Sequence, residues 1–120
     1  MAGAQKKSLD TPDQVRTPDK GVVHLVEVGG ASVGRATLQP GWRWSESIKP
    51  IVGGDSCQIN HLGIVLAGAM RIEHMDGTAI DLAVGDIYQI QPGHDAWVVG
   101  DDEFVGVEFD SSAAASFAKG

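Results

Sequence analysis

Two residue types that bind metals lie four positions apart near the middle of the chain. Cys57 is the only cysteine and His61 is one of four histidines, both within the stretch DSCQINHLGIVLAGAM at residues 55–70. Thiolate and imidazole are ligands that first-row divalent ions accept, and the combination favours zinc or iron. Since alternate residues of a strand share a face, Asp55, Cys57 and His61 could all enter one cavity. His94 adds a second imidazole, so the best three ligands are Cys57, His61 and His94. A coordination position left open on the ion would make it a Lewis acid or a water activator.

The same pair has other interpretations. A lone cysteine is commonly buried as a small hydrophobe, and a strand histidine is usually held by an ordinary hydrogen bond. A cysteine nucleophile with a histidine base is not expected, because positions i and i+4 of a regular strand are about 13 Å apart, too far for direct proton transfer. A metal site over that distance requires the strand to bend or bulge so that the side chains converge.

Aromatic side chains indicate a second kind of binding surface. Trp42 and Trp44 stand two positions apart and face the same way in an extended segment. Together with Tyr88 and Trp97 they could form the aromatic wall of a pocket for a small apolar or planar ligand. The alternative is that these rings serve core or dimer packing, which aromatic residues do well.

Short alternating runs predict the strands that would carry these side chains. Between residues 21 and 110, β-branched and apolar runs are separated by turn signals such as Pro40-Gly41 and Pro92-Gly93. Asp76-Gly77 is the favoured signal of a two-residue hairpin. Residues 42–54 break the alternation, so a loop is expected there. Evenly spaced short strands in a chain with 16 glycines predict an all-β antiparallel sandwich or barrel.

A chain of 120 residues is long enough for one compact domain. Residues 1–20 are polar, carry two prolines and lack amphipathic periodicity, so we expect a flexible N-terminal arm that could order against a partner subunit in a homodimer. Residues 21–110 are expected to form the barrel. Residues 111–120 are expected to be a tail that forms one helical turn or frays.

Composition limits the partners and the compartment. The formal net charge of -7, from 16 acidic and 9 basic residues, argues against nucleic acid as a partner. A single cysteine cannot form an internal disulfide, so we expect a cytoplasmic protein. No segment approaches the ~20 apolar residues of a membrane span, so no membrane partner is expected.

The order of strands and turns resembles that of a small single-domain cupin, a double-sheet jelly roll. The first cupin motif is G-(x)5-H-x-H-(x)3,4-E-(x)6-G. Its second half resembles this sequence at His61, which is followed by LGIVLA and Gly68. By this alignment His61 takes the place of the glutamate ligand, Cys57 that of the second histidine and Asp55 that of the first. Every usual ligand of the first motif is therefore replaced.

The second cupin motif, G-(x)5-P-x-G-(x)2-H-(x)3-N, keeps both glycines as Gly85 and Gly93. Its histidine falls on Ala96, and His94 lies two residues earlier, on the same face if the strand is regular. The resemblance covers residues 21–110. It implies a cupin-type jelly-roll β-barrel with a cavity for a divalent metal and a small organic ligand, with dioxygenase, isomerase or lyase chemistry.

Two rival functions follow from the lost family ligands. The first is a metal-free binding or sensor module whose tryptophans line an apolar pocket for a small molecule. The second is a structural or partner-binding barrel that uses its acidic surface and its N-terminal arm. Metal content separates these rivals from the metal-dependent interpretation.

Overall fold

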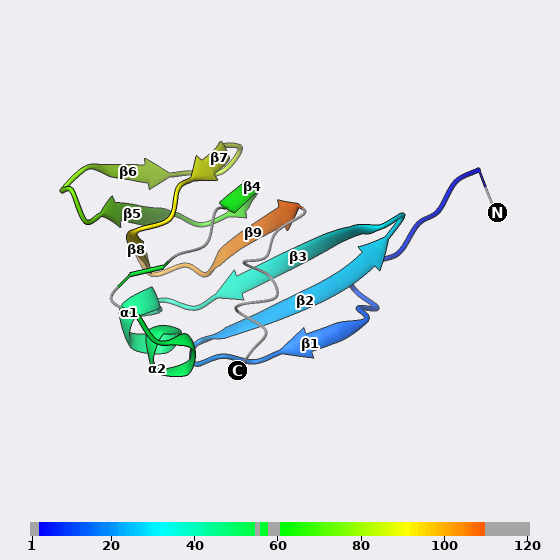
Figure 1. Ribbon diagram of the computed structural model, residues 1–120, viewed down its shortest axis with the longest axis horizontal. Coiled ribbons are helices and arrows are strands. Elements are labelled where there is room, and N and C mark those ends of the chain that lie inside the picture. The colour runs from blue at the N-terminus through cyan, green and yellow to red at the C-terminus, as the bar shows by residue number, and fades with distance from the viewer. Residues whose placement is uncertain (1–2, 55, 58–60, 110–120) are drawn as a thin grey trace.

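The computed structural model describes residues 3–54, 56–57 and 61–109, and these residues form an all-β fold (Figure 1). The elements in chain order are β1 (Gln14–Arg16), β2 (Gly21–Val28), β3 (Ala31–Leu38), α1 (Trp44–Ser47), α2 (Lys49–Val52), β4 (His61–Ala67), β5 (Met70–His74), β6 (Ala79–Leu82), β7 (Ile87–Ile90), β8 (His94–Val98) and β9 (Phe104–Phe109). Among the described residues, no helix is long and apolar enough to cross a membrane.

The strands form two antiparallel sheets. The larger sheet has the order β1-β2-β3-β9-β4-β7, and the smaller has the order β6-β5-β8. Strands distant in sequence are neighbours: β9 lies between β3 and β4, and β8 pairs with β5. Two sheets linked by such crossovers confirm the predicted jelly roll.

The core lies between the two sheets because each strand turns its apolar alternate residues inward. Val23 and Val65 of the larger sheet and Ile72 of the smaller are each 1% exposed and belong to one buried cluster. In β8 the inward residues are His94, Ala96 and Val98, all buried. This alternation places polar side chains at selected inward positions, where they face the core rather than water.

Gly68 closes β4 and lets the chain turn into β5. Its φ of 77° lies in the left-handed region, and a Cβ there would overlap the carbonyl oxygen of Glu103. The pairing of β4 with β9 shifts register between Val65 and Ala67, just before this turn. The glycine shared with the first cupin motif is thus required by both backbone conformation and close approach.

Three segments differ in detail from the sequence-based expectation. The predicted arm contains β1, whose Val15 pairs with His24 of β2. The loop at residues 42–54 contains the two short helices. The predicted hairpin is present, but the bond from the His74 amide to the Thr78 carbonyl closes a three-residue loop ending at Gly77. The tail at residues 111–120 lies outside the described residues.

Over β4, β7 and β9, the face of the larger sheet turned away from the core is largely apolar. Leu62 and Leu66 of β4 are 49% and 50% exposed, and Ile87 of β7 is 69% exposed. Ile64 pairs directly with both Ile87 and Val107, so these three side chains form a row on that face, in which Ile87 is exposed and Val107 is buried. The outer face over β4, β7 and β9 is an exposed hydrophobic surface.

Candidate metal centre

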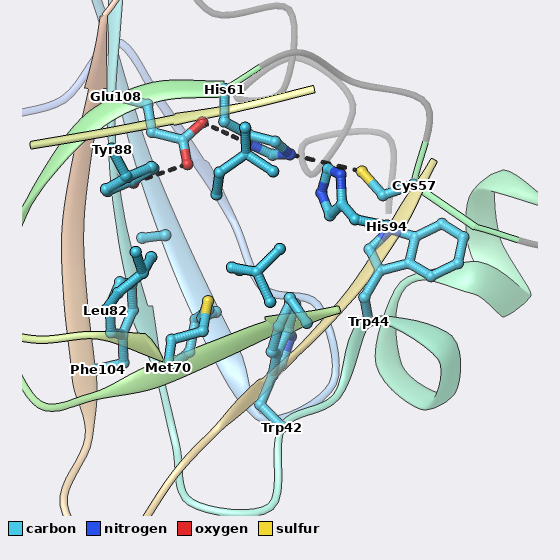
Figure 2. Close-up of a pocket in the computed structure, with 15 residues that line it drawn as sticks. Trp42, Trp44, Cys57, His61, Met70, Leu82, Tyr88, His94, Phe104 and Glu108 are labelled. Atoms are coloured by element: carbon cyan, nitrogen blue, oxygen red, sulfur yellow. Dashed lines mark hydrogen bonds and ion pairs between the residues drawn. The ribbon is translucent and has the colours of Figure 1, made fainter. Parts of the chain in front are cut away.

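A cavity lies between the two sheets beside α1, and the side chains lining it come from both sheets (Figure 2). The space open to the centre of a water-sized molecule is about 30 Å³, which is enough for about two ordered waters. Its wall is mostly apolar. The polar side chains on it are those of Cys57, His61, Tyr88, His94 and Glu108.

Cys57, His61 and His94 converge at one end of this cavity. One donor atom from each of the three residues lies within 4.8 Å of the other two, and all three residues are buried. The distance from Cys57 Sγ to His61 Nε2 is 3.5 Å, and the rings of His61 and His94 have centroids 5.0 Å apart. The structure therefore brings together the three residues that the sequence analysis selected.

Backbone pairing explains why Cys57 and His94 meet. The Cys57 amide donates to the His94 carbonyl at 2.6 Å, and the Gly93 amide donates to the Cys57 carbonyl at 2.7 Å. This isolated bridge fixes Cys57 opposite the first residue of β8. His61 begins β4 on the facing side of the cavity.

The expected separation of about 13 Å between Cys57 and His61 is wrong. That figure assumed that both residues belong to one regular strand, whereas β4 begins only at His61 and Cys57 lies outside it. The Cys57 and His61 side chains come within hydrogen-bond distance, at 3.5 Å, which is the convergence that a metal site requires. Cys57 and His61 are therefore close enough for direct proton transfer, contrary to the expectation from the sequence.

Glu108 is a functional candidate that the sequence analysis missed. Its Oε1 accepts a hydrogen bond from His61 Nδ1 at 2.8 Å, and its Oε2 accepts one from the Tyr88 hydroxyl at 2.9 Å. Glu108 reaches the cavity because β9 lies beside β4, with Glu108 paired to Gly63. A signal existed in the sequence: Phe104, Gly106 and Glu108 alternate on one face, so a carboxylate interrupts an inward row.

Each imidazole is held by its Nδ1 atom. His94 Nδ1 donates to the carbonyl oxygen of Gln91 at 2.7 Å, because a carbonyl can only accept. His61 Nδ1 is held in the same way by the Glu108 carboxylate. In metal sites a histidine ligand characteristically donates its other N–H to a carboxylate or carbonyl, which fixes the tautomer and the ring orientation. Both histidines have this partner, which leaves Nε2 as the atom for a ligand bond.

The electrostatics of the centre favour positive charge. Burial alone would lower the pKa of His61, but hydrogen bonds and charge interactions with Cys57 and Glu108 outweigh it and raise the pKa to about 9. The pKa of Tyr88 is also raised, by burial and by the Glu108 carboxylate. The hydrogen bonds and charge interactions with Cys57 and Glu108 that stabilise a proton on His61 would also stabilise a metal cation in its place.

The residues fit a small divalent ion. Zinc–sulfur and zinc–nitrogen bonds of about 2.3 and 2.0–2.1 Å at a tetrahedral angle put sulfur and nitrogen about 3.6 Å apart. The Cys57 Sγ to His61 Nε2 distance of 3.5 Å is close to this value. One thiolate and two imidazoles make three protein ligands, the number found at zinc sites that keep a position open. Asp55, the fourth sequence candidate, lies outside the described residues.

The aromatic residues predicted for the pocket divide into two groups. Trp42, Trp44 and Tyr88 are buried and line the cavity. Trp97 is on the opposite face of β8, where the Arg43 guanidinium lies 4.3 Å from the ring centroid. The reason is the two-residue period of a strand: His94 and Ala96 point inward, so Trp97 points outward.

The segment that carries Trp42 and Trp44 is anchored to β8 by Asp95. The Asp95 carboxylate accepts hydrogen bonds from Arg43 Nε at 3.0 Å and from the Ser45 amide at 3.1 Å. The Val98 amide donates to the Trp42 carbonyl at 3.0 Å. These contacts hold α1 at the side of the cavity beside Cys57 and His94 (Figure 2).

No protein-family model matches the sequence, and no curated protein matches it. Solved structures do match. A sugar phosphate isomerase of the cupin superfamily from Silicibacter pomeroyi is 15% identical, with a TM-score of 0.60 over 88% of this chain and 74% of that chain. A protein with a double-stranded β-helix domain from Klebsiella pneumoniae is 20% identical, with a TM-score of 0.59 over 89% and 84% of the two chains.

Oxalate decarboxylase from Bacillus subtilis is a third match, 13% identical, with a TM-score of 0.63 over 91% of this chain and 29% of the longer enzyme. Likeness at these identities concerns the fold. The sheet order, the position of the cavity between the sheets and these matches agree. The chain is a small domain with the cupin fold, in which the usual metal-binding motifs are replaced.

Proposed function

We propose that this protein is a cupin-fold metalloprotein that holds a divalent ion through Cys57, His61 and His94 and binds a small organic ligand beside it. The observation that carries the proposal is the convergence of three buried donor atoms within 4.8 Å, with both imidazoles held at Nδ1. A histidine placed only for packing would not need to share one end of the cavity with two other donor atoms.

The protein's own residues would divide the work. Cys57, His61 and His94 would bind the ion, Glu108 would orient His61, and Tyr88 would hold the second oxygen of Glu108 in place. When bound, the ion would supply Lewis-acid chemistry toward an oxygen-bearing ligand at its open position. The apolar wall, with Trp42 and Trp44, would exclude water and pack against the ligand. Isomerase, lyase and dioxygenase chemistry all suit such a centre, and zinc or iron suits its ligands.

Metal analysis of protein produced without a histidine tag tests the proposal. We expect about one divalent ion per chain in the wild type and loss of that ion in Cys57→Ser and His61→Ala. His24→Ala is the matched control, because His24 lies on the far side of β2 and bonds to Arg35 rather than to the cavity. Wild-type protein without stoichiometric metal after refolding with zinc or iron would overturn the assignment, as would a double variant that keeps its metal.

A second candidate function is metal-free binding of a small molecule in the same cavity. One observation favours it: Cys57, His61, Glu108 and Tyr88 form a continuous chain of hydrogen bonds without any ion. Buried polar groups satisfied in this way need no metal for stability. Quenching of tryptophan fluorescence by small apolar compounds in protein shown to lack metal would support this function.

A further inference from the structure

We propose that the cavity selects small uncharged ligands and rejects compounds with two negative charges, such as dicarboxylates and phosphates. This inference rests on the proposed metal site and names the ligand class of that site. It is carried by the charges of the residues around the cavity, by the absence of lysine and arginine among the described lining residues, and by the small size of the space.

Among the described residues, the charges at the proposed centre already balance without a ligand. A divalent ion brings two positive charges, and the Cys57 thiolate and the Glu108 carboxylate bring one negative charge each. His61 and His94 would be neutral as metal ligands. A dianion entering this site would leave two negative charges without compensation in an apolar cavity, and burial of uncompensated charge is strongly unfavourable.

The described part of the cavity wall offers no cation to offset such a charge. Its lining residues include neither lysine nor arginine. Arg43 is the basic residue next to Trp42 and Trp44 in the chain, but its guanidinium bonds to Asp95 at 3.0 Å and lies over Trp97 outside the cavity.

The remainder of the wall favours an apolar ligand of few atoms. Met70, Leu82 and Phe104 lie across the cavity from the histidines (Figure 2). The space open to the centre of a water-sized molecule is small, about 30 Å³, which favours a ligand of few non-hydrogen atoms. An uncharged carbonyl compound meets both conditions, since it has one oxygen end for the ion and an apolar end for these side chains.

Cobalt-loaded protein allows the metal site and the ligand class to be read separately. Cobalt(II) bound by a thiolate gives a sulfur-to-metal charge-transfer band, and its weaker visible bands shift when another ligand binds. Two probes have the same number of non-hydrogen atoms: 2,3-butanedione is uncharged, and oxalate carries two negative charges. Inorganic phosphate is a second anionic probe.

We expect butanedione to shift the visible bands while the charge-transfer band persists. The concentration of butanedione that gives this shift should be at least tenfold lower than any concentration of oxalate or phosphate with the same effect. Oxalate should either leave the spectrum unchanged or remove the cobalt from the protein by chelation. In both cases no oxalate complex forms in the cavity. An oxalate or phosphate complex with the charge-transfer band retained, at concentrations similar to those of butanedione, would overturn the inference. So would the absence of any response to butanedione. A missing charge-transfer band would instead overturn the proposed metal site.

Glu108→Gln provides a second test on protein that retains cobalt. Removal of one negative charge should narrow the preference for butanedione over oxalate by about tenfold, which corresponds to about 1.4 kcal/mol. Glu103→Gln is the control, because Glu103 is exposed and bonds to Gln39 outside the cavity. An unchanged preference in Glu108→Gln would contradict the role of charge balance.

Discussion

The carboxylate of Glu108 accepts a hydrogen bond from His61 Nδ1 at 2.8 Å and thereby turns His61 Nε2 toward Cys57 Sγ, 3.5 Å away. The two residues lie on adjacent strands, β9 and β4, and are 47 positions apart in the chain. This contact links the barrel to the proposed metal centre, because it fixes both the tautomer and the direction of one ligand.

Glu108→Gln is expected to weaken metal binding by about 10- to 100-fold, the usual effect of removing the partner of a ligating histidine. The glutamine amide has one oxygen in place of two, so it cannot accept from His61 Nδ1 and from the Tyr88 hydroxyl through separate oxygens as Glu108 does. The His61 ring therefore loses its fixed orientation. Competition with a chromophoric chelator measures the affinity. Glu103→Gln should bind as the wild type does, and equal affinities for both variants would show that Glu108 does not position His61.

The stability of the metal-free protein should fall as the pH rises toward 9. The pKa of His61 is raised from 6.5 to about 9 in the folded state, so the folded form holds its proton more tightly than the unfolded form. The resulting stabilisation is fully present below about pH 6.5 and is lost as the pH rises through about 9. Its upper size is on the order of 3 kcal/mol, from the shift in pKa.

Urea unfolding of metal-free protein between pH 6 and pH 10 measures this dependence. Cys57 contacts the same imidazole, so Cys57→Ser is compared with the wild type to separate the thiol from the histidine. His61→Gln should lose most of the slope. A wild-type free energy of unfolding that is flat across this range would contradict the charge arrangement around His61.

Gly63→Ala is expected to destabilise the fold by about 1–3 kcal/mol, the usual cost of overpacking. A Cβ at Gly63 would lie 2.7 Å from the Tyr88 hydroxyl and 2.5 Å from the Val107 carbonyl oxygen. The substitution should also displace Tyr88 from Glu108. Gly3→Ala is the control, because a Cβ there meets nothing within 4 Å. Thermal unfolding of both variants gives the comparison, and equal midpoints would argue against the close packing of Tyr88.

We propose that two copies of the chain associate through the outer face of β4, β7 and β9. Leu62, Leu66 and Ile87 are exposed there. Among the described residues, the outward positions of these three strands carry no acidic side chain, in a chain with net charge -7. Two such faces can meet without bringing carboxylates together, and exposed apolar patches of this kind mark protein contacts.

Light scattering coupled to size exclusion tests this association. The wild type should be a dimer, and the double variant Leu62→Glu, Ile87→Glu should be a folded monomer. Met75→Glu is the control, since Met75 is 73% exposed in the β5–β6 hairpin, away from that face. A wild type that is monomeric at all concentrations would contradict the proposal.

The fold was predictable because turn chemistry and alternation are local. Gly68 marks a close backbone approach, and Gly77 ends the hairpin loop that Asp76-Gly77 predicted. The inward position of His94 followed from the strand period once Ala96 was placed. The prediction that Trp97 lines the pocket is wrong for the same reason: alternation over residues 94–98 places Trp97 on the face of β8 opposite to His94 and Ala96.

The candidate metal centre depends on contacts between distant segments, which the local pattern of a single sequence does not reveal. Cys57 meets His94 through a bridge between segments 37 positions apart, and Glu108 meets His61 through pairing of β9 with β4. Strand order decides both contacts, and periodicity gives only the face of a residue, not its neighbour. The position of β1 within the predicted arm was missed because a three-residue strand has too few residues to show alternation.

X-ray absorption at the metal edge tests the central claim most directly. For protein loaded with zinc, we predict one sulfur neighbour at about 2.3 Å and two imidazole nitrogens at about 2.0–2.1 Å. The sulfur should be absent from the Cys57→Ser spectrum. A wild-type spectrum with nitrogen and oxygen neighbours alone would contradict a centre built from Cys57, His61 and His94.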